Sequence, residues 1–225
     1  MSSFFTNDVF RLLFPSTLQT LQMVFFSTVF SLLLGVPLGV LLTITSAEEQ
    51  GGIMPRPVLN SVLGRIVNIL RSFPFIILMI LLFPLSRILV GTSIGTTATI
   101  VPLSIAAAPF VARVIETALK EVDPGVVQAA RAMGSTTWQI IWKVLIPEAT
   151  PSLISGVTLT IINLIGYSAM AGAIGGGGLG DLAIRYGFQR FRGDVMFAAV
   201  VVILVLVELI QVIGNRWSAR VIARR

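Results

Sequence analysis

Long apolar runs, separated by short polar segments, dominate this chain and constrain its fold more than any other feature. Hydrophobic residues make up 55% of its 225 residues and charged residues 12%, whereas about a quarter of a soluble domain is charged. The hydrocarbon core of a bilayer, about 30 Å thick, requires roughly 20 apolar residues per helix. The sequence therefore predicts an all-α integral membrane protein of about five transmembrane helices, with no room for a soluble ATPase domain.

The apolar runs predict where these helices lie. They are expected over Thr17–Ile44, Arg65–Leu85, Ile94–Leu119, Pro151–Ala171 and Val195–Gly214. The first run is far longer than the apolar core of a signal peptide, about 7–15 residues, so we interpret it as a retained helix. The predicted organisation is an outer tail over residues 1–16, a transmembrane domain over 17–214 and a basic inner tail over 215–225.

The distribution of Lys and Arg predicts the orientation. With the N-terminus outside, 11 of the 16 basic residues lie on the cytoplasmic side, as the positive-inside rule requires. Arg185, Arg190 and Arg192, which follow a glycine run, are among the exceptions. We therefore expect a multi-pass membrane protein oriented N-out, C-in.

The net charge of +6 does not indicate nucleic acid, because the basic residues sit at the ends of apolar runs, where lipid head groups explain them. The chain contains no Cys and no His, which excludes disulfides, thiol nucleophiles, histidine bases and structural zinc sites. We expect no catalytic residue, no metal and no cofactor.

Residues 120–147 are amphipathic and form no span. Asp123 and Pro124 predict a helix start, as N-cap and first helical residue, for a short helix of about Val126–Met133. Gly134 ends that helix, because glycine accepts the left-handed conformation. Ser135 or Thr136 then caps a second short helix, residues 137–145, which Pro147 ends. The alternative interpretation is a single interfacial helix lying on lipid.

The spacing of this segment resembles the cytoplasmic EAA loop of ABC importer permeases. Gln128-Ala129-Ala130, then Gly134, then Val144-Leu-Ile-Pro147 keep the spacing of the family pattern Glu-Ala-Ala, Gly, Ile-x-Leu-Pro. Gln128, Val144 and Ile146 depart from it, and Gln128 lacks the charge of the family Glu. The resemblance implies a coupling helix that sits in a cleft of a separate ATPase subunit. The implied coupling residues are Gln128, Ala129, Ala130, Arg131, Gly134 and Pro147.

Three further stretches narrow the resemblance. Asn68–Leu78, Val90–Gly95 and Gly166–Gly180 are similar to the permease of methionine ABC importers, and the similarity covers about residues 17–214. It implies a homodimer of this chain, two ATP-hydrolysing partner subunits and an external substrate-binding lipoprotein. It further implies that L- or D-methionine is carried by alternating access, with ATP used by the partner subunits.

The glycine run at 175–180 lacks the Gly-Lys-Ser/Thr ending of a nucleotide-binding loop. We expect a re-entrant or tightly bent segment, tolerated where protein or a water-filled cavity receives it. Tyr167, Ser168 and Met170 precede it and are predicted to line the translocation path, since a flexible Met suits a gate that reshapes. The alternative is that Met170 packs against a neighbouring helix.

A coupled carrier and a membrane enzyme are the alternative functions for an apolar, multi-span chain. A proton- or sodium-coupled carrier usually shows buried ionisable groups near the membrane centre and an internal repeat, and only Arg71 and Glu208 lie well inside a predicted span. A membrane enzyme would require a nucleophile–base set or paired carboxylates, which are not evident. Arg71 and Glu208 lie at equal predicted depth, about 9 Å from the cytoplasmic boundary. They are predicted either to pair or to act separately, with Arg71 reaching the head groups.

Overall fold

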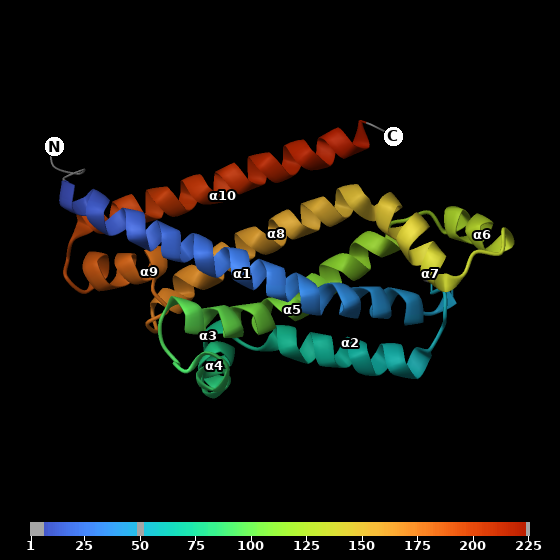
Figure 1. Ribbon diagram of the computed structural model, residues 1–225, viewed down its shortest axis with the longest axis horizontal. Helices are drawn as coiled ribbons and strands as arrows, with labels where there is room; N and C mark the ends of the chain where they lie inside the picture. Colours follow the sequence, from blue (N-terminus) through green and yellow to red (C-terminus); the bar gives the residue numbers. More distant parts are fainter. Residues whose placement is uncertain (1–6, 49–51, 224–225) are drawn as a thin grey trace. The chain divides into compact units, whose positions relative to one another are not determined.

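A computed structural model describes residues 7–48 and 52–223, and within these residues it contains helices and turns but no strand. The chain divides into two compact units, described here one at a time. Unit 1 comprises Met1–Ser31, Phe73–Ala107 and Thr160–Val212, and unit 2 comprises Leu32–Ser72, Ala108–Leu159 and Ile213–Arg225. Four long helices contribute residues to both units: α1 (Asn7–Thr45), α5 (Thr96–Lys120), α8 (Ile146–Gly172) and α10 (Gly193–Ile222) (Figure 1).

The described residues confirm the predicted number of spans. Four continuous helical stretches are long and apolar enough to cross a membrane: Asp8–Thr45, Thr96–Lys120, Thr137–Gly172 and Gly193–Ile222. A fifth crossing requires the bent pair of α2 (Pro57–Ser72) and α3 (Phe75–Leu81). The chain is therefore a helical, multi-pass membrane protein.

The predicted second span, Arg65–Leu85, is wrong as a single helix. α2 ends at Ser72, and α3 leaves it at an angle of 101°. Proline disfavours the helical conformation of the residue before it, so Pro74 stops α2 and becomes the N-cap of α3. A further short helix, α4 (Phe83–Val90), ends at Gly91, whose φ of +85° only glycine adopts readily.

The first and last helices of the chain, α1 and α10, extend into the predicted N-terminal and C-terminal tails. α1 extends back to Asn7, the first described residue, and Val9 and Leu13 are buried in a cluster of unit 1 with Leu179 and Val195. At the other end, α10 continues to Ile222. Residues 7–16 and 215–222 are thus helical, and the side of the membrane on which each end lies stays a prediction.

Two segments between the spans also differ from expectation. Pro147 does not end the second short helix, because a π-helical turn, η2 (Ile141–Leu145), joins α7 (Thr137–Ile140) to α8. This wider turn accommodates a residue that has no N–H and whose ring crowds a regular α-helix. After the glycine run, α9 (Gly178–Leu182) and a π turn, η3 (Ala183–Phe188), form a helical segment that the sequence analysis missed.

In unit 2, α1 and α5 approach closely at two glycines. A Cβ on Gly35 would lie 2.6 Å from the Cβ of Val111, and one on Gly39 would lie 2.6 Å from the Cβ of Ile115. Large aliphatic side chains of α5 fill the space that the missing side chains leave. The core of this unit gathers around Ile115 and extends to the loop between α5 and α8.

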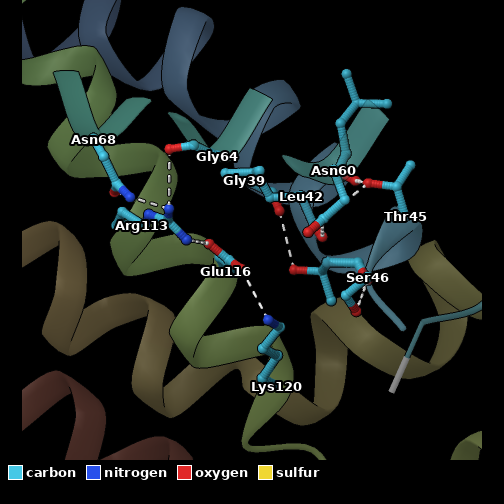
Figure 2. A network of polar contacts seen from close by, with 12 residues as sticks. Gly39, Leu42, Thr45, Ser46, Asn60, Gly64, Asn68, Arg113, Glu116 and Lys120 are labelled. Atoms are coloured by element: carbon cyan, nitrogen blue, oxygen red, sulfur yellow. Dashed lines mark hydrogen bonds and ion pairs between the residues drawn. The ribbon is translucent and has the colours of Figure 1, made fainter. Parts of the chain in front are cut away.

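Polar contacts also join α1, α2 and α5 within unit 2 (Figure 2). Asn60 of α2 donates to the Leu42 carbonyl of α1 at 2.7 Å. Arg113 of α5 donates to the Asn68 side chain of α2 at 2.9 Å and to Glu116 at 2.6 Å. Such contacts pair polar groups between neighbouring helices of a bundle, and they are part-buried or exposed here.

The predicted pair of Arg71 and Glu208 would join residues of different units and stays a prediction. The predicted start of the second helix at Arg65, on which the depth of Arg71 was estimated, is wrong, because α2 begins at Pro57 and places Arg71 in its last turn.

Candidate functional site

The loop between α5 and α8 contains one short helix before Gly134, as predicted, whereas the second helical segment starts at Thr137 as predicted but continues through η2 into α8. α6 (Pro124–Ala132) starts at Asp123, whose carboxylate accepts a hydrogen bond from the Gly125 N–H at 2.7 Å. Pro124 occupies the first turn, where its missing N–H has no cost. In Figure 1, α6 and α7 follow one another at the turn between α5 and α8.

Gly134 joins the two helices with φ of +78°. Its N–H donates to the Arg131 carbonyl at 2.9 Å, and the next N–H, of Ser135, donates to the Ala130 carbonyl at 3.1 Å. These bonds satisfy the last carbonyls of α6, the usual purpose of a left-handed residue at a helix end. No atom lies within 4 Å of a Cβ built on Gly134, so glycine is present for its backbone conformation.

Thr136, one of the two predicted caps, starts α7. Its hydroxyl accepts from the Gln139 N–H at 3.3 Å, and the Gln139 side chain accepts from the Thr136 N–H at 2.9 Å. This reciprocal capping box fixes the direction in which the chain leaves Gly134.

The six predicted coupling residues divide between an outer face and an inner face. Gln128, Ala129, Gly134 and Pro147 are exposed, whereas Ala130 is buried and Arg131 is half-buried. The outer four are available to a partner. Ala130 packs in the core around Ile115 instead.

Arg131 attaches the loop to the segment between α1 and α2. Its guanidinium donates to the carbonyls of Ile53 at 2.6 Å and Gly52 at 3.2 Å, and lies 3.5 Å from the Glu48 carboxylate. The side chain therefore holds α6 in place from within unit 2. The sequence could not predict that the Arg131 side chain points into the chain, because its acceptor carbonyls lie 78 and 79 positions earlier.

Large apolar side chains cover the outer surface of the loop, and none of them is among the six predicted coupling residues. Met133 is 80% exposed and Trp138 68%, with Val126 and Trp142 also exposed. The rings of Trp138 and Trp142 meet edge to face at 5.5 Å. Their four-residue spacing on one helix face was the available signal. An exposed apolar surface of this kind is typical of a protein or membrane contact.

The predicted path residues lie in unit 1 and have different environments. Tyr167 stacks on Phe75, with ring centroids 4.4 Å apart. Ser168 is buried and donates to the Ile165 carbonyl of its own helix at 2.7 Å. Met170 is 48% exposed. That these three residues line the translocation path stays a prediction.

The glycine run is tightly bent, with positive φ at Gly175, Gly177 and Gly178. Two side chains of α1 accept hydrogen bonds from the first N–H groups of α9, the helix that follows the glycine run. The Gln19 side chain accepts from the Gly178 N–H at 2.9 Å, and the Thr20 hydroxyl accepts from the Leu179 N–H at 2.9 Å. These bonds hold α9 against the N-terminal part of α1 in unit 1.

The family model described as "Binding-protein-dependent transport system inner membrane component" matches residues 35–224. The chain belongs to this family. It is therefore a membrane permease component of a binding-protein-dependent, ABC-type transport system, which confirms the family predicted from the EAA-like loop.

Individual relatives agree with this assignment. The chain is 52% identical over 210 residues, covering 93% of it and 92% of the relative, to a Vibrio cholerae protein named "Probable D-methionine transport system permease protein MetI". It is 52% identical over 167 residues to the "Methionine import system permease protein MetP" of Bacillus subtilis, covering 74% and 75% of the two chains.

Solved structures give the same fold. A chain of the "MetNI methionine ABC transporter" in inward-facing conformations superposes with a TM-score of 0.93 at 45% identity, covering 96% of this chain and 99% of that one. An amino-acid ABC transporter solved with histidines matches at a TM-score of 0.75 and 21% identity, which shows a common fold only.

Proposed function

We propose that this chain is the membrane-spanning permease subunit of an ABC importer that carries methionine, as the L or D isomer, across a bacterial cytoplasmic membrane. The observation that carries the proposal is the α6–Gly134–α7 loop in a chain 52% identical to a methionine permease over 93% of its length. The chain hydrolyses nothing itself, and ATP is used by a separate subunit.

Two copies of the chain enclose a central path and bind two ATPase subunits through their loops. The exposed face of each loop carries Gln128, Ala129, Met133 and Trp138. Ala129 allows close approach of the partner backbone, and the large apolar side chains supply contact area. Inside the loop, Arg131 transmits force, because it joins α6 to the segment between α1 and α2.

Transport follows alternating access. Closure of the ATPase subunits pushes the two loops together and turns the path outward. An external substrate-binding lipoprotein then delivers methionine, and release of the hydrolysis products turns the path inward again. Because α5 and α8 flank the loop and are both spans, movement of the loop is passed directly into the membrane.

The proposal is tested in lipid vesicles that contain this chain, its ATPase and the binding protein. We expect methionine and the binding protein together to stimulate ATP hydrolysis and to drive methionine uptake. Trp138→Ala with Met133→Ala should reduce ATPase binding about tenfold or more, as loss of buried interface anchors does. Trp217→Ala is the matched control, because Trp217 is 62% exposed but belongs to α10 and not to the loop.

Two results would contradict the proposal. One is ATP hydrolysis that does not respond to methionine with any binding protein encoded beside the chain. The other is normal ATPase binding by the double variant, which would remove the loop surface from the interface.

A further inference from the structure

Unit 2 contains a cavity of about 360 Å³ that the loop and the predicted path residues do not explain. Its walls come from α2, α5 and α8 and from the residue that follows α5. The lining combines two guanidinium groups, one carboxylate and two hydroxyls with the apolar side chains of Phe110 and Val114. This volume lies within the range of small-molecule sites, about 300–1,000 Å³.

Arg71 supplies the free positive charge of this cavity. It stands in the last turn of α2, its residue is exposed, and no described residue of unit 2 forms a hydrogen bond or ion pair with it. A lone charge inside a membrane protein costs several kcal/mol unless it faces water, a partner or a ligand. Arg71 therefore marks a wet, cationic wall.

Arg113, the second guanidinium, is already occupied. It donates to Glu116 at 2.6 Å and to Asn68 at 2.9 Å, while Glu116 also accepts from Lys120 at 2.9 Å (Figure 2). Glu116 is only 4% exposed, and this carboxylate balances part of the charge of its two neighbours. The cluster fixes the wall between α2 and α5 and leaves Arg71 as the cation that can bind a ligand.

Glu121 supplies the negative charge. One of its carboxylate oxygens accepts from the Ser152 hydroxyl at 2.5 Å. No ion pair joins Glu121 to Arg71 among the described residues. The cavity thus offers a cation and an anion that do not neutralise each other, with apolar side chains beside them.

We propose that this cavity is a subsite for a zwitterionic amino acid with an apolar side chain. Arg71 binds the ligand carboxylate, since a guanidinium matches a carboxylate with two parallel hydrogen bonds. Glu121 binds the ligand ammonium group, and Phe110 and Val114 contact the side chain. The proposal rests on the proposed function: the subsite holds methionine inside the permease before release on the side of the α6–α7 loop.

The test uses the nucleotide-free permease–ATPase complex in nanodiscs, without the binding protein. Thr117 lines the cavity and is exposed, and the chain has no cysteine, so Thr117→Cys provides a single thiol on this subunit. We expect methionine to slow its modification by a water-soluble thiol reagent. Methioninol, which lacks the carboxylate, and the desamino acid, which lacks the ammonium, should protect roughly 10- to 100-fold less well.

Substitutions test whether Arg71 binds the ligand carboxylate or instead forms an ion pair with Glu208. Arg71→Gln should weaken protection by methionine about tenfold or more and remove the preference over methioninol, while Arg71→Lys retains part of it. Arg65→Gln, an exposed arginine of the same helix outside the cavity, should change nothing. Glu208→Gln should also change nothing. An equal loss in Glu208→Gln would mean that Arg71 acts as an ion-pair partner and would overturn the proposal.

Two further outcomes overturn the subsite without affecting the proposed function. The first is absence of protection at millimolar methionine in a complex whose methionine uptake is normal. The second is protection that depends on anionic rather than neutral nanodisc lipids and not on methionine, which would assign Arg71 to a lipid phosphate. If the complex shows no methionine-dependent uptake at all, it is the proposed function that fails.

Discussion

The two connections on either side of α8 both contain glycines at positive φ, yet they use glycine for different reasons. Gly134, before α8, is exposed, and a Cβ added to it would meet no atom within 4 Å. Gly178, after α8, is buried, and a Cβ there would lie 2.6 Å from the Thr20 hydroxyl oxygen and 2.8 Å from the Met23 methyl carbon. Gly134 is needed for the backbone turn that orients the exposed helices of the loop. Gly178 is needed because it allows α9 to pack closely against α1.

This difference separates the loop surface that we propose binds the ATPase subunit from a segment that packs against other helices of the same chain. The α6–α7 loop presents apolar side chains outward and is held from behind by Arg131. The segment from the glycine run to α9 presents backbone N–H groups inward to Gln19 and Thr20. Substitutions in the loop should therefore change mainly ATPase binding and transport, whereas substitutions in the glycine run should change mainly stability.

The largest loss of stability is expected from a substitution in the glycine run that leads into α9. A Cβ on Gly180 would overlap the carbonyl oxygen and Cα of Ala169, which are backbone atoms and cannot move aside. Gly180→Ala should cost about 3 kcal/mol or more of stability, at the upper end for overpacked sites. Yield of monodisperse protein and thermal unfolding in detergent measure this.

Gly166→Ala in α8 is the matched control, because its Cβ would meet nothing within 4 Å. It should be neutral or slightly stabilising, since alanine favours helix over glycine. Equal stability of Gly180→Ala and Gly166→Ala would contradict the idea that glycine is required at position 180 for close packing.

The second largest effect is expected at Gly134, in the loop before α8. It should appear in ATPase binding and transport more than in stability. Gly134→Val places a β-branched residue at φ of +78°, which costs about 1–2 kcal/mol or redirects α7. The chain should still insert in the membrane but bind the ATPase and transport methionine about tenfold less well. Gly134→Ala should show a smaller loss. Unchanged ATPase binding and uptake by the valine variant would refute a coupling role for this turn.

A third prediction distinguishes the two faces of the loop. Arg131→Gln removes charged hydrogen bonds to the carbonyls of Ile53 and Gly52 and should lower stability by about 1 kcal/mol as well as coupling. Gln128→Ala, on the exposed face, should weaken ATPase binding without changing the unfolding temperature. If both variants changed only ATPase binding, Arg131 would have to face the partner rather than the chain.

The smallest effect concerns accessibility beside the glycine run. Met170→Cys should react with a water-soluble thiol reagent in at least one nucleotide state, because Met170 is 48% exposed. Ser168→Cys should react far more slowly, since Ser168 is 2% exposed and bonded to its own helix. Faster reaction at position 168 would mean that this stretch rearranges during transport. No reaction at either position would place Met170 against protein or lipid.

Much of the site was predictable because its signals are local. Asp123, Pro124, Gly134 and Thr136 act on backbone groups within a few residues of themselves, so their roles follow from spacing alone. Pro74 was equally local, but its effect on the second span was overlooked. The direction of Arg131 was not predictable, because its acceptor carbonyls belong to a distant segment.

By itself, the sequence determined the membrane class, the number of spans, and the helix caps and glycine turn of the loop. Apolar content and helix caps act within a turn or within one span, whatever the rest of the chain does. Only the tertiary structure decided which side of each helix meets a neighbour: that Ser168 is buried while Met170 is open, and that Arg113 is neutralised while Arg71 is free within unit 2. Orientation about a helix axis depends on packing between residues far apart in the chain, and no local pattern encodes it.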